Sequence, residues 1–212
     1  MCSGRVDLEF ILRAFANGQD GVFVGGCRLG ECNYVTQGNF DALGNTLLCK
    51  KIMEHIGLNP ERLNIAFMNA SDGILLANSI NDFSATVKEL GPIGEGEGLD
   101  IERLKFKLNA LRKLVPYLRL VERERLRVPV KSEQAFREFF ESDDFNRLFE
   151  ELVVDKLAMS EITTLLKDKP LSTGEIADQL GLPPSDVARH MNTSSMHGLV
   201  RYDTGLKSFA LA

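Results

Sequence analysis

The run Gly21-Val22-Phe23-Val24-Gly25-Gly26 constrains the fold of this chain more than any other stretch. A short, apolar, β-branched segment bounded by glycines is typical of a buried parallel strand. Amphipathic helices are predicted over residues 7–16, 39–56 and 72–90, and a second strand over residues 63–68. Because helices and strands alternate, we predict a parallel, flavodoxin-like α/β sheet with right-handed crossovers over residues 1–91.

The beginning of this predicted domain is short. Residues 1–4 lead directly into the first helix, so no strand precedes it. Two strands make a poor sheet. We therefore expect that the first strand of the sheet is missing from this chain.

The composition changes after residue 91. Residues 92–98 are rich in glycine and glutamate without apolar periodicity, and they predict a linker. Residues 99–155 carry many charges of both signs, with leucines recurring every three to four positions. This pattern predicts a charged helical connector, interrupted near Pro116 and Pro129.

Residues 156–212 predict a winged-helix domain. Ser172 and Glu175 have the spacing of a capping box at the start of a short helix, and Gly181 ends that helix before Pro183-Pro184 begins the next. Residues 199–202 and 206–211 flank an Asp-Thr-Gly turn and predict a terminal β-hairpin.

The composition excludes several classes of protein. The chain has 212 residues, 44% of them hydrophobic and 26% charged, as in an ordinary globular protein. No apolar run is long enough for a transmembrane helix, and the N-terminus lacks the layout of a signal peptide, so we expect a cytoplasmic protein. A formal net charge of -5 provides no global attraction to nucleic acid.

The four cysteines are expected to serve metal or redox chemistry rather than a disulfide framework. In Gly26-Cys27-Arg28-Leu29-Gly30-Glu31-Cys32, two thiols follow a buried strand, and the glycines permit the tight turn that would let both sulfurs meet one iron pair. Cys2 precedes the first helix, which places it at the same carboxyl edge of the sheet. Cys2, Cys27 and Cys32 are therefore the predicted metal ligands.

Alternative interpretations of these residues remain open. Cysteines are small, mildly apolar residues that turns tolerate, although three thiols at two strand ends favour ligands. Cys49 lies in the helix over residues 39–56, and we predict that it packs in the core, with a fourth ligand as the alternative. Arg5 and Arg28, beside the predicted ligands, either offset the charge of a cluster or are solvated surface residues.

Four stretches of the first 91 residues carry a family resemblance. They are Cys2-Ser3-Gly4-Arg5-Val6-Asp7, the segment from Gly21 through Cys27, Gly30 and Cys32 to Tyr34, Gly57-Leu58-x-Pro60-Glu61-Arg62-Leu63, and Ala70-Ser71-Asp72-Gly73. Their order and spacing resemble the methyl-viologen-reducing hydrogenase delta (iron-sulfur) subunit family, MvhD-like. The resemblance implies a 2Fe-2S cluster on Cys2, Cys27 and Cys32, and electron transfer between an oxidoreductase module and a heterodisulfide reductase A-like flavoprotein.

Two features depart from that family. Arg28-Leu29 stands where its members usually have His-Pro, and their N-terminus is longer, with a first strand and its own cysteine motif. The resemblance implies that this chain is shorter by about 40 residues, roughly one βα unit, and that the missing segment supplies the remaining ligand or ligands. Some relatives carry selenocysteine there, so a gene start placed after an in-frame stop codon would explain the difference.

The winged-helix unit offers a second functional hypothesis. Arg189, Asn192, Thr193 and Ser194 lie on the helix that would read DNA, but residues 156–212 hold six basic and six acidic residues, whereas phosphate contacts require a basic face. Nucleic acid is thus an unfavoured partner. His190 and His197 are two helical turns apart without a third ligand, so they predict surface or packing histidines rather than a metal site.

No catalytic residue is predicted, because neither a nucleophile arrangement nor a nucleotide-binding loop is found. We predict a non-catalytic electron-transfer subunit of an oxidoreductase complex, with a redox-responsive winged-helix DNA-binding regulator as the alternative. The predicted partners are a heterodisulfide reductase A-like flavoprotein and a hydrogenase, formate dehydrogenase or other reductase module. The sequence does not distinguish among these electron donors.

Overall fold

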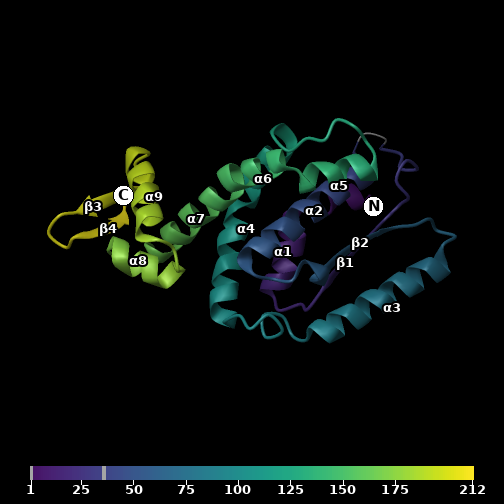
Figure 1. Ribbon diagram of the computed structural model, residues 1–212, viewed down its shortest axis with the longest axis horizontal. Coiled ribbons are helices and arrows are strands. Elements are labelled where there is room, and N and C mark those ends of the chain that lie inside the picture. The colour runs from purple at the N-terminus through teal and green to yellow at the C-terminus, as the bar shows by residue number, and fades with distance from the viewer. Residues whose placement is uncertain (1, 35–36) are drawn as a thin grey trace. The chain divides into compact units, whose positions relative to one another are not determined.

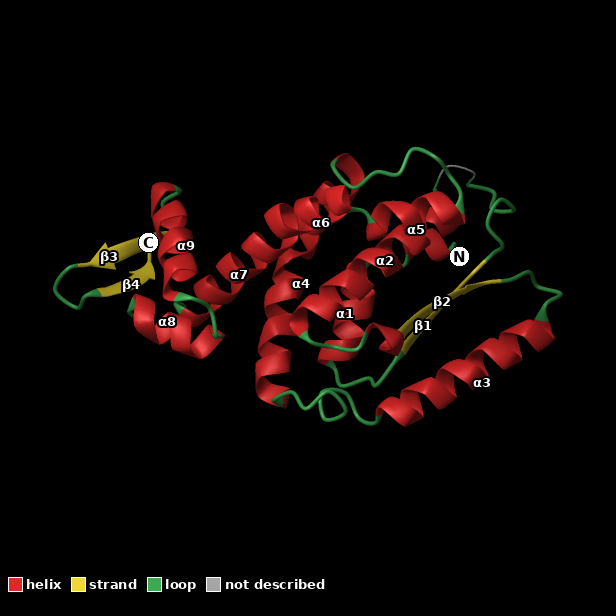
Figure 2. Cartoon of the chain, viewed as in Figure 1, coloured by secondary structure: helices red, strands yellow, loops and turns green. Residues whose placement is uncertain are grey.

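A computed structural model of the chain describes residues 2–34 and 37–212. The chain forms two compact units, Met1–Phe149 and Glu150–Ala212 (Figures 1 and 2). The first unit joins the predicted α/β domain and most of the predicted connector, and the second contains the C-terminal helices and hairpin.

A two-stranded parallel sheet organises the first unit. Strand β1 (Val22–Gly26) pairs with β2 (Leu63–Phe67), with Val22 opposite Leu63 and Gly26 opposite Phe67. Among the described residues this sheet has no third strand. The predicted α/β class and the predicted order of these elements are therefore found, and the parallel pair is joined by a helical crossover.

Helices lie on both sides of the two strands (Figure 1). Helix α1 (Leu8–Ala16) follows the short 3-10 helix η1 (Ser3–Arg5), and Asp7 caps it by accepting a hydrogen bond from the Glu9 N–H at 2.8 Å. Helix α2 (Asn39–Ile56) is the crossover, and it ends at Gly57, whose left-handed backbone suits glycine. Both α1 and α2 contact the strands and each other, and they form the core of the unit.

Helix α3 (Gly73–Leu90) follows β2 and has no buried residue. Because side chains alternate along a strand, Phe23 points away from the buried Val24 and meets Phe83 of α3, with 5.7 Å between ring centroids. The predicted helix is present, but its apolar positions Ile74, Leu75 and Ile80 are exposed.

The charged connector is helical and packs on the α/β domain. Helix α4 (Ile101–Glu124) contacts α1 and α2, and α5 (Glu133–Glu141) contacts α2 and α6 (Asp143–Phe149). The predicted interruption near Pro116 is wrong, because α4 continues through it, whereas the break near Pro129 is found. Pro116 lies on the exposed side of α4, where water can replace the hydrogen bond that proline removes.

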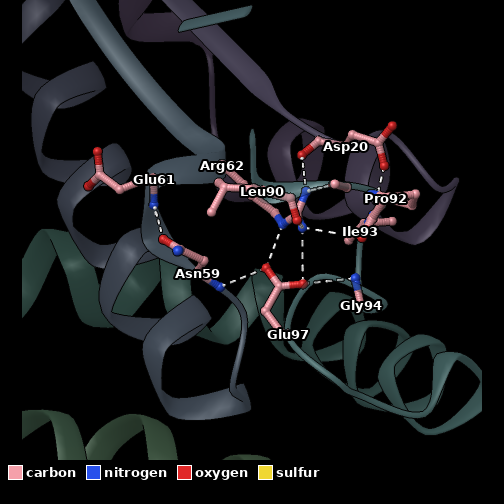
Figure 3. Close-up of polar contacts among 10 residues, drawn as sticks. Asp20, Asn59, Glu61, Arg62, Leu90, Pro92, Ile93, Gly94 and Glu97 are labelled. Carbon is pink, nitrogen blue, oxygen red and sulfur yellow. Dashed lines mark hydrogen bonds and ion pairs between the residues drawn. The ribbon is translucent and has the colours of Figure 1, made fainter. Parts of the chain in front are cut away.

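Arg62 ties the glycine-rich segment after α3 to the start of β2 (Figure 3). It ends the 3-10 helix η2 (Pro60–Arg62), its side chain is fully buried, and its Nε donates to Glu97 Oε1 at 2.5 Å. The guanidinium also donates to the carbonyls of Asp20, Leu90, Gly91 and Pro92 at 2.8–3.2 Å. Residues 92–98 are therefore a folded loop around a buried ion pair.

The second unit begins with a π-helical segment, η3 (Glu150–Val154), followed by α7 (Asp155–Leu165), α8 (Thr173–Leu180) and α9 (Pro184–Met196). The capping box of Ser172 and Glu175 is present. Strands β3 (Val200–Asp203) and β4 (Ser208–Leu211) form an antiparallel hairpin, and Leu171 bridges to Phe209. The predicted succession of helix, turn, helix and hairpin is found in this unit.

None of the helices in residues 2–34 and 37–212 is both long enough and apolar enough to cross a membrane.

Candidate metal centre

Three backbone segments that carry cysteines meet beside the carboxyl end of β1. Cys2 precedes η1, Cys27 directly follows β1, and Cys32 lies five residues further along the loop to α2. A Cβ added at Gly4 would lie 2.5 Å from Gly38 Cα, and one added at Gly26 would lie 3.0 Å from Ser3 Oγ. Glycine at these positions lets η1 approach both the strand end and the start of α2.

Gly38 marks the point where two of the sulfurs lie together. A Cβ at this position would lie 2.6 Å from Cys32 Sγ and 3.3 Å from Cys2 Sγ. The backbone φ of Gly38 is +67°, a conformation that residues with a side chain rarely adopt. Both the space and the backbone therefore require glycine between these thiols.

The thiols also influence each other's ionisation. Backbone N–H groups of Tyr34 and Asn39 donate to Cys32 and lower the pKa of its thiol, helped by its contacts with Cys27 and Cys2. Burial, the hydrogen bond to Cys32 and the neighbouring thiols raise the pKa of Cys27. Cys32 lies at the N-terminal end of α2, whose dipole favours a thiolate, the form that binds metal.

Asn39, the first residue of α2, holds the cysteine loop in place. Its side-chain amide donates to the carbonyls of Cys27 at 2.9 Å and Arg28 at 2.8 Å, and lies 3.7 Å from Cys27 Sγ. Asn39 is fully buried, and neither its Oδ1 nor Ser3 Oγ has a hydrogen-bond partner among the described residues. Asn39 and Gly38 were not predicted from the sequence, although a Gly-Asn pair at a helix start, shortly after a Cys-x4-Cys loop, was a usable signal.

The other residues singled out from the sequence lie apart from these thiols or are engaged elsewhere. Cys49 is fully buried in α2, ten residues beyond Asn39, and burial raises its pKa to about 12. This places it in the core, as predicted. Arg28 pairs with Asp72 at 2.7 Å, and Arg5 is exposed.

In residues 2–34 and 37–212 no group of three or more His, Cys, Asp or Glu side chains forms a complete site for a metal ion. Cys2, Cys27 and Cys32 are thus neighbours whose sulfurs interact without converging on a single point. Their chemistry still suits an iron–sulfur cluster, since thiolates, backbone N–H donors and a buried hydroxyl are groups that such clusters use.

The residues predicted for DNA contact are mostly occupied or buried. Arg189 pairs with Asp155 at 3.1 Å and lies 3.9 Å from Asp186. Ser194 is fully buried, and the Thr193 hydroxyl donates to the Arg189 carbonyl at 3.0 Å. Burial lowers the pKa of His190, consistent with a packing histidine.

An α/β domain with thiols gathered at the carboxyl ends of its parallel strands belongs to the class of thiol-bearing redox domains. The family described as methyl-viologen-reducing hydrogenase, delta subunit, matches residues 1–91, and the chain belongs to this family. The pattern of the IclR helix-turn-helix domain matches residues 166–204.

Named relatives agree with this assignment over the same region. The iron-sulfur subunit of the F420-non-reducing hydrogenase of Archaeoglobus profundus is 45% identical over 91 residues, which are 43% of this chain and 66% of that protein. The corresponding vhu iron-sulfur subunit of Methanopyrus kandleri is 38% identical over 92 residues, 43% of this chain and 69% of its own length.

A larger protein contains a similar segment. The Ferredoxin/F(420)H(2)-dependent CoB-CoM heterodisulfide reductase of Methanosarcina acetivorans has an A-type subunit that is 46% identical over 94 residues, which are 44% of this chain and 12% of that protein. The chain therefore spans about two thirds of the hydrogenase proteins and about an eighth of the reductase protein that it matches.

Proposed function

We propose that this chain is an iron–sulfur electron-transfer subunit that relays electrons between an oxidoreductase module and a heterodisulfide reductase A-like flavoprotein through a 2Fe-2S cluster. The observation that carries this proposal is the meeting of Cys2 and Cys32 at Gly38, with Cys27 bonded to Cys32 through hydrogen, in the domain that matches the family. A relay protein needs no substrate pocket, and it transforms no substrate itself.

The cluster would be held by Cys2, Cys27 and Cys32. Cys32 is the more readily ionised of the two thiols with perturbed pKa, because the Tyr34 and Asn39 N–H groups stabilise its thiolate. Ser3 Oγ, which has no described partner, can donate to a cluster sulfide or thiolate. When bound, the cluster supplies one-electron redox chemistry, and the protein sets its potential through these hydrogen bonds and burial.

The fourth ligand of a 2Fe-2S cluster comes from outside this trio in our proposal. Such clusters take four protein ligands, commonly four thiolates. Cys49 is excluded as the fourth, because ten residues of α2 separate it from Asn39, about 15 Å along a helix. A partner protein or a further segment of this one would donate it, and this chain alone would hold its cluster weakly.

The proposed partners follow from the relatives. Their printed names join the iron-sulfur component of a hydrogenase with the A-type component of a heterodisulfide reductase. We infer that this chain works in the cytoplasm between a hydrogenase, formate dehydrogenase or other reductase module and a heterodisulfide reductase A-like flavoprotein. The winged-helix unit would then dock on one of these proteins.

Iron and acid-labile sulfide in anaerobically purified full-length protein test the proposal. We expect about two of each per chain at full loading, with a rhombic electron paramagnetic resonance signal after reduction. Cys27→Ala and Cys32→Ala should lose both, while Cys49→Ala, the matched control in the core, should retain them.

Two results would overturn the proposal. One is the absence of iron and sulfide from wild-type protein purified together with its complex. The other is undiminished iron in Cys27→Ala and Cys32→Ala protein that remains folded.

The match to a helix-turn-helix domain supports one second candidate, a redox-responsive regulator that binds DNA. The pairing of Arg189 with Asp155 and Asp186 weighs against it, because this arginine is already neutralised. Retention on DNA at physiological salt that is lost in Arg189→Ala would favour the regulator. Co-purification with a flavin-containing reductase would favour the relay.

A further inference from the structure

A recess rich in cationic side chains lies between η1, α2, the end of α4 and the segment leading to α5. A cavity of about 640 Å³ is lined by Arg119, Arg123, Arg127 and Lys131, which recur every four residues, together with Arg5 of η1. Because α4 ends at Glu124, the last two members of this series come from the loop beyond the helix. Two structural elements thus place their cations around one depression.

Most of these cations have no carboxylate partner. Among the described residues, Arg5, Arg123, Arg127 and Lys131 make no ion pair, and Lys131 instead lies 5.0 Å from the centre of the Phe136 ring. Arg119 pairs with Asp7. Elsewhere in the first unit, arginines such as Arg62, Arg112 and Arg137 are paired. Free positive charge therefore gathers at this recess in a chain whose net charge is -5.

The acidic groups of the recess lie on its floor and do not cancel the rim. Burial, then the charge of Asp41, raises the pKa of Glu122 to about 7. Burial also raises the pKa of Asp41. The floor is otherwise apolar, with Phe40 stacked on Phe136 at 5.6 Å between ring centroids. The exposed rim is positive, and the floor carries less negative charge than its two carboxyls would suggest.

The recess continues to the candidate metal centre. A second cavity, about 1280 Å³, is lined by Cys2 and Gly38 and shares Arg5, Asp41, Arg119 and Arg123 with the first. An anionic occupant of the cationic rim would therefore lie directly beside the cysteines. The combined opening is larger than the space that one small anion needs, and its evenly spaced cations suit a chain of carboxylates.

We propose that this recess is the docking surface for an acidic polypeptide segment of an electron-transfer partner, held by Arg5, Arg123, Arg127 and Lys131 next to Cys2. The inference rests on the proposed relay function, because the position beside the metal centre is what gives docking a purpose. Residues 119–131 lie outside the region that matches the hydrogenase family, so this surface is a feature of the connector. Opposite charges of this kind speed and orient association between proteins.

Binding of a fluorescein-labelled deca-glutamate peptide to the full-length chain tests the surface without requiring a loaded cluster. We expect binding to weaken at least about 10-fold between 50 and 300 mM NaCl. Arg123→Glu and Arg127→Glu should each weaken it by about 5-fold or more. Arg125→Glu is the matched control, because Arg125 is exposed on the same stretch but does not line the recess, and it should bind as wild type does.

Three outcomes would overturn the proposal. They are no peptide binding at 50 mM NaCl, equal weakening by Arg125→Glu, and tighter binding of inorganic phosphate or a ten-nucleotide single-stranded DNA than of the peptide. The last would assign the recess to a small anion or to nucleic acid. Since iron content is measured separately, peptide binding by an iron-free chain would refute the relay and keep the surface, whereas an iron-loaded chain that ignores the peptide would do the reverse.

Discussion

Helices α2 and α3 have the same length, 18 residues each, and flank the same strand, β2, yet their surroundings are opposite. Twelve residues of α2 are buried, and the helix contacts η1, α1, α4, α5 and β2. In α3 no residue is buried, and its described contacts are limited mainly to η2 and Phe23. Helical periodicity therefore predicted both helices equally well but did not predict which one would be covered.

The difference shows how the first unit is stabilised. Parallel sheets are normally covered on both faces, but here α1, α2 and the connector cover one face, while α3 is anchored chiefly at its C-terminal end. That anchor is Arg62, which binds the Leu90 and Gly91 carbonyls where α3 ends (Figure 3). Breaking the anchor and breaking the core should therefore affect the two helices differently.

Arg62→Met should have the largest effect. Glu97 would remain buried without its partner, and the carbonyls at the end of α3 would lose their donors. We expect a loss of about 3–5 kcal/mol in the free energy of unfolding, measured by urea denaturation. Hydrogen exchange should increase first in the last turn of α3. Lys51→Met, which breaks an exposed pair with Glu54 on α2, should change stability by less than about 1 kcal/mol.

Matched isoleucines test the contrast in burial directly. Ile52 of α2 is 1% exposed, and Ile52→Ala should lower the free energy of unfolding by about 2–4 kcal/mol, because it leaves a cavity in the core. Denaturation midpoints measure this cost. An effect below about 1 kcal/mol would contradict the assignment of α2 to the centre of the unit.

Glu122 links pH to the packing around α2. Its pKa is about 7 in the folded chain, against an ordinary 4.5, and its Oε1 lies 4.0 Å from the position of a Cβ on Gly44. Between pH 4.5 and 7 the folded state binds more protons than the unfolded state, so stability should fall as pH rises, by on the order of 2 kcal/mol. Glu122→Gln should remove this slope and be more stable than wild type at about pH 8. Glu124→Gln, at an exposed position, should keep the wild-type profile.

Ile74→Ala should have the smallest effect. Ile74 is 81% exposed on α3, so the substitution removes little buried area and should change stability by less than about 0.5 kcal/mol. Denaturation beside Ile52→Ala gives the comparison at constant chemistry. Equal costs at the two positions would mean that α3 is covered in the protein as it exists in solution.

The candidate centre divides in a similar way between what could and could not be predicted. The cysteines and the strand that precedes Cys27 were recognisable, because glycines and thiols at a strand end form a local pattern. Gly38 and Asn39 were not recognised, because their roles arise only when η1 lies against the start of α2. The cationic recess was equally hidden, since Arg5 and Lys131 are far apart in sequence.

The sequence by itself determined the order of the elements, their ends and the family of the first 91 residues. These depend on backbone capping and turn conformation within a few residues, as at Asp7, Ser172 and Gly57. Only the tertiary structure decided that α2 is buried and α3 exposed, that α4 runs through Pro116, and that Arg62 is enclosed by a glycine-rich loop. Burial depends on which distant surfaces meet, and local periodicity carries no record of that.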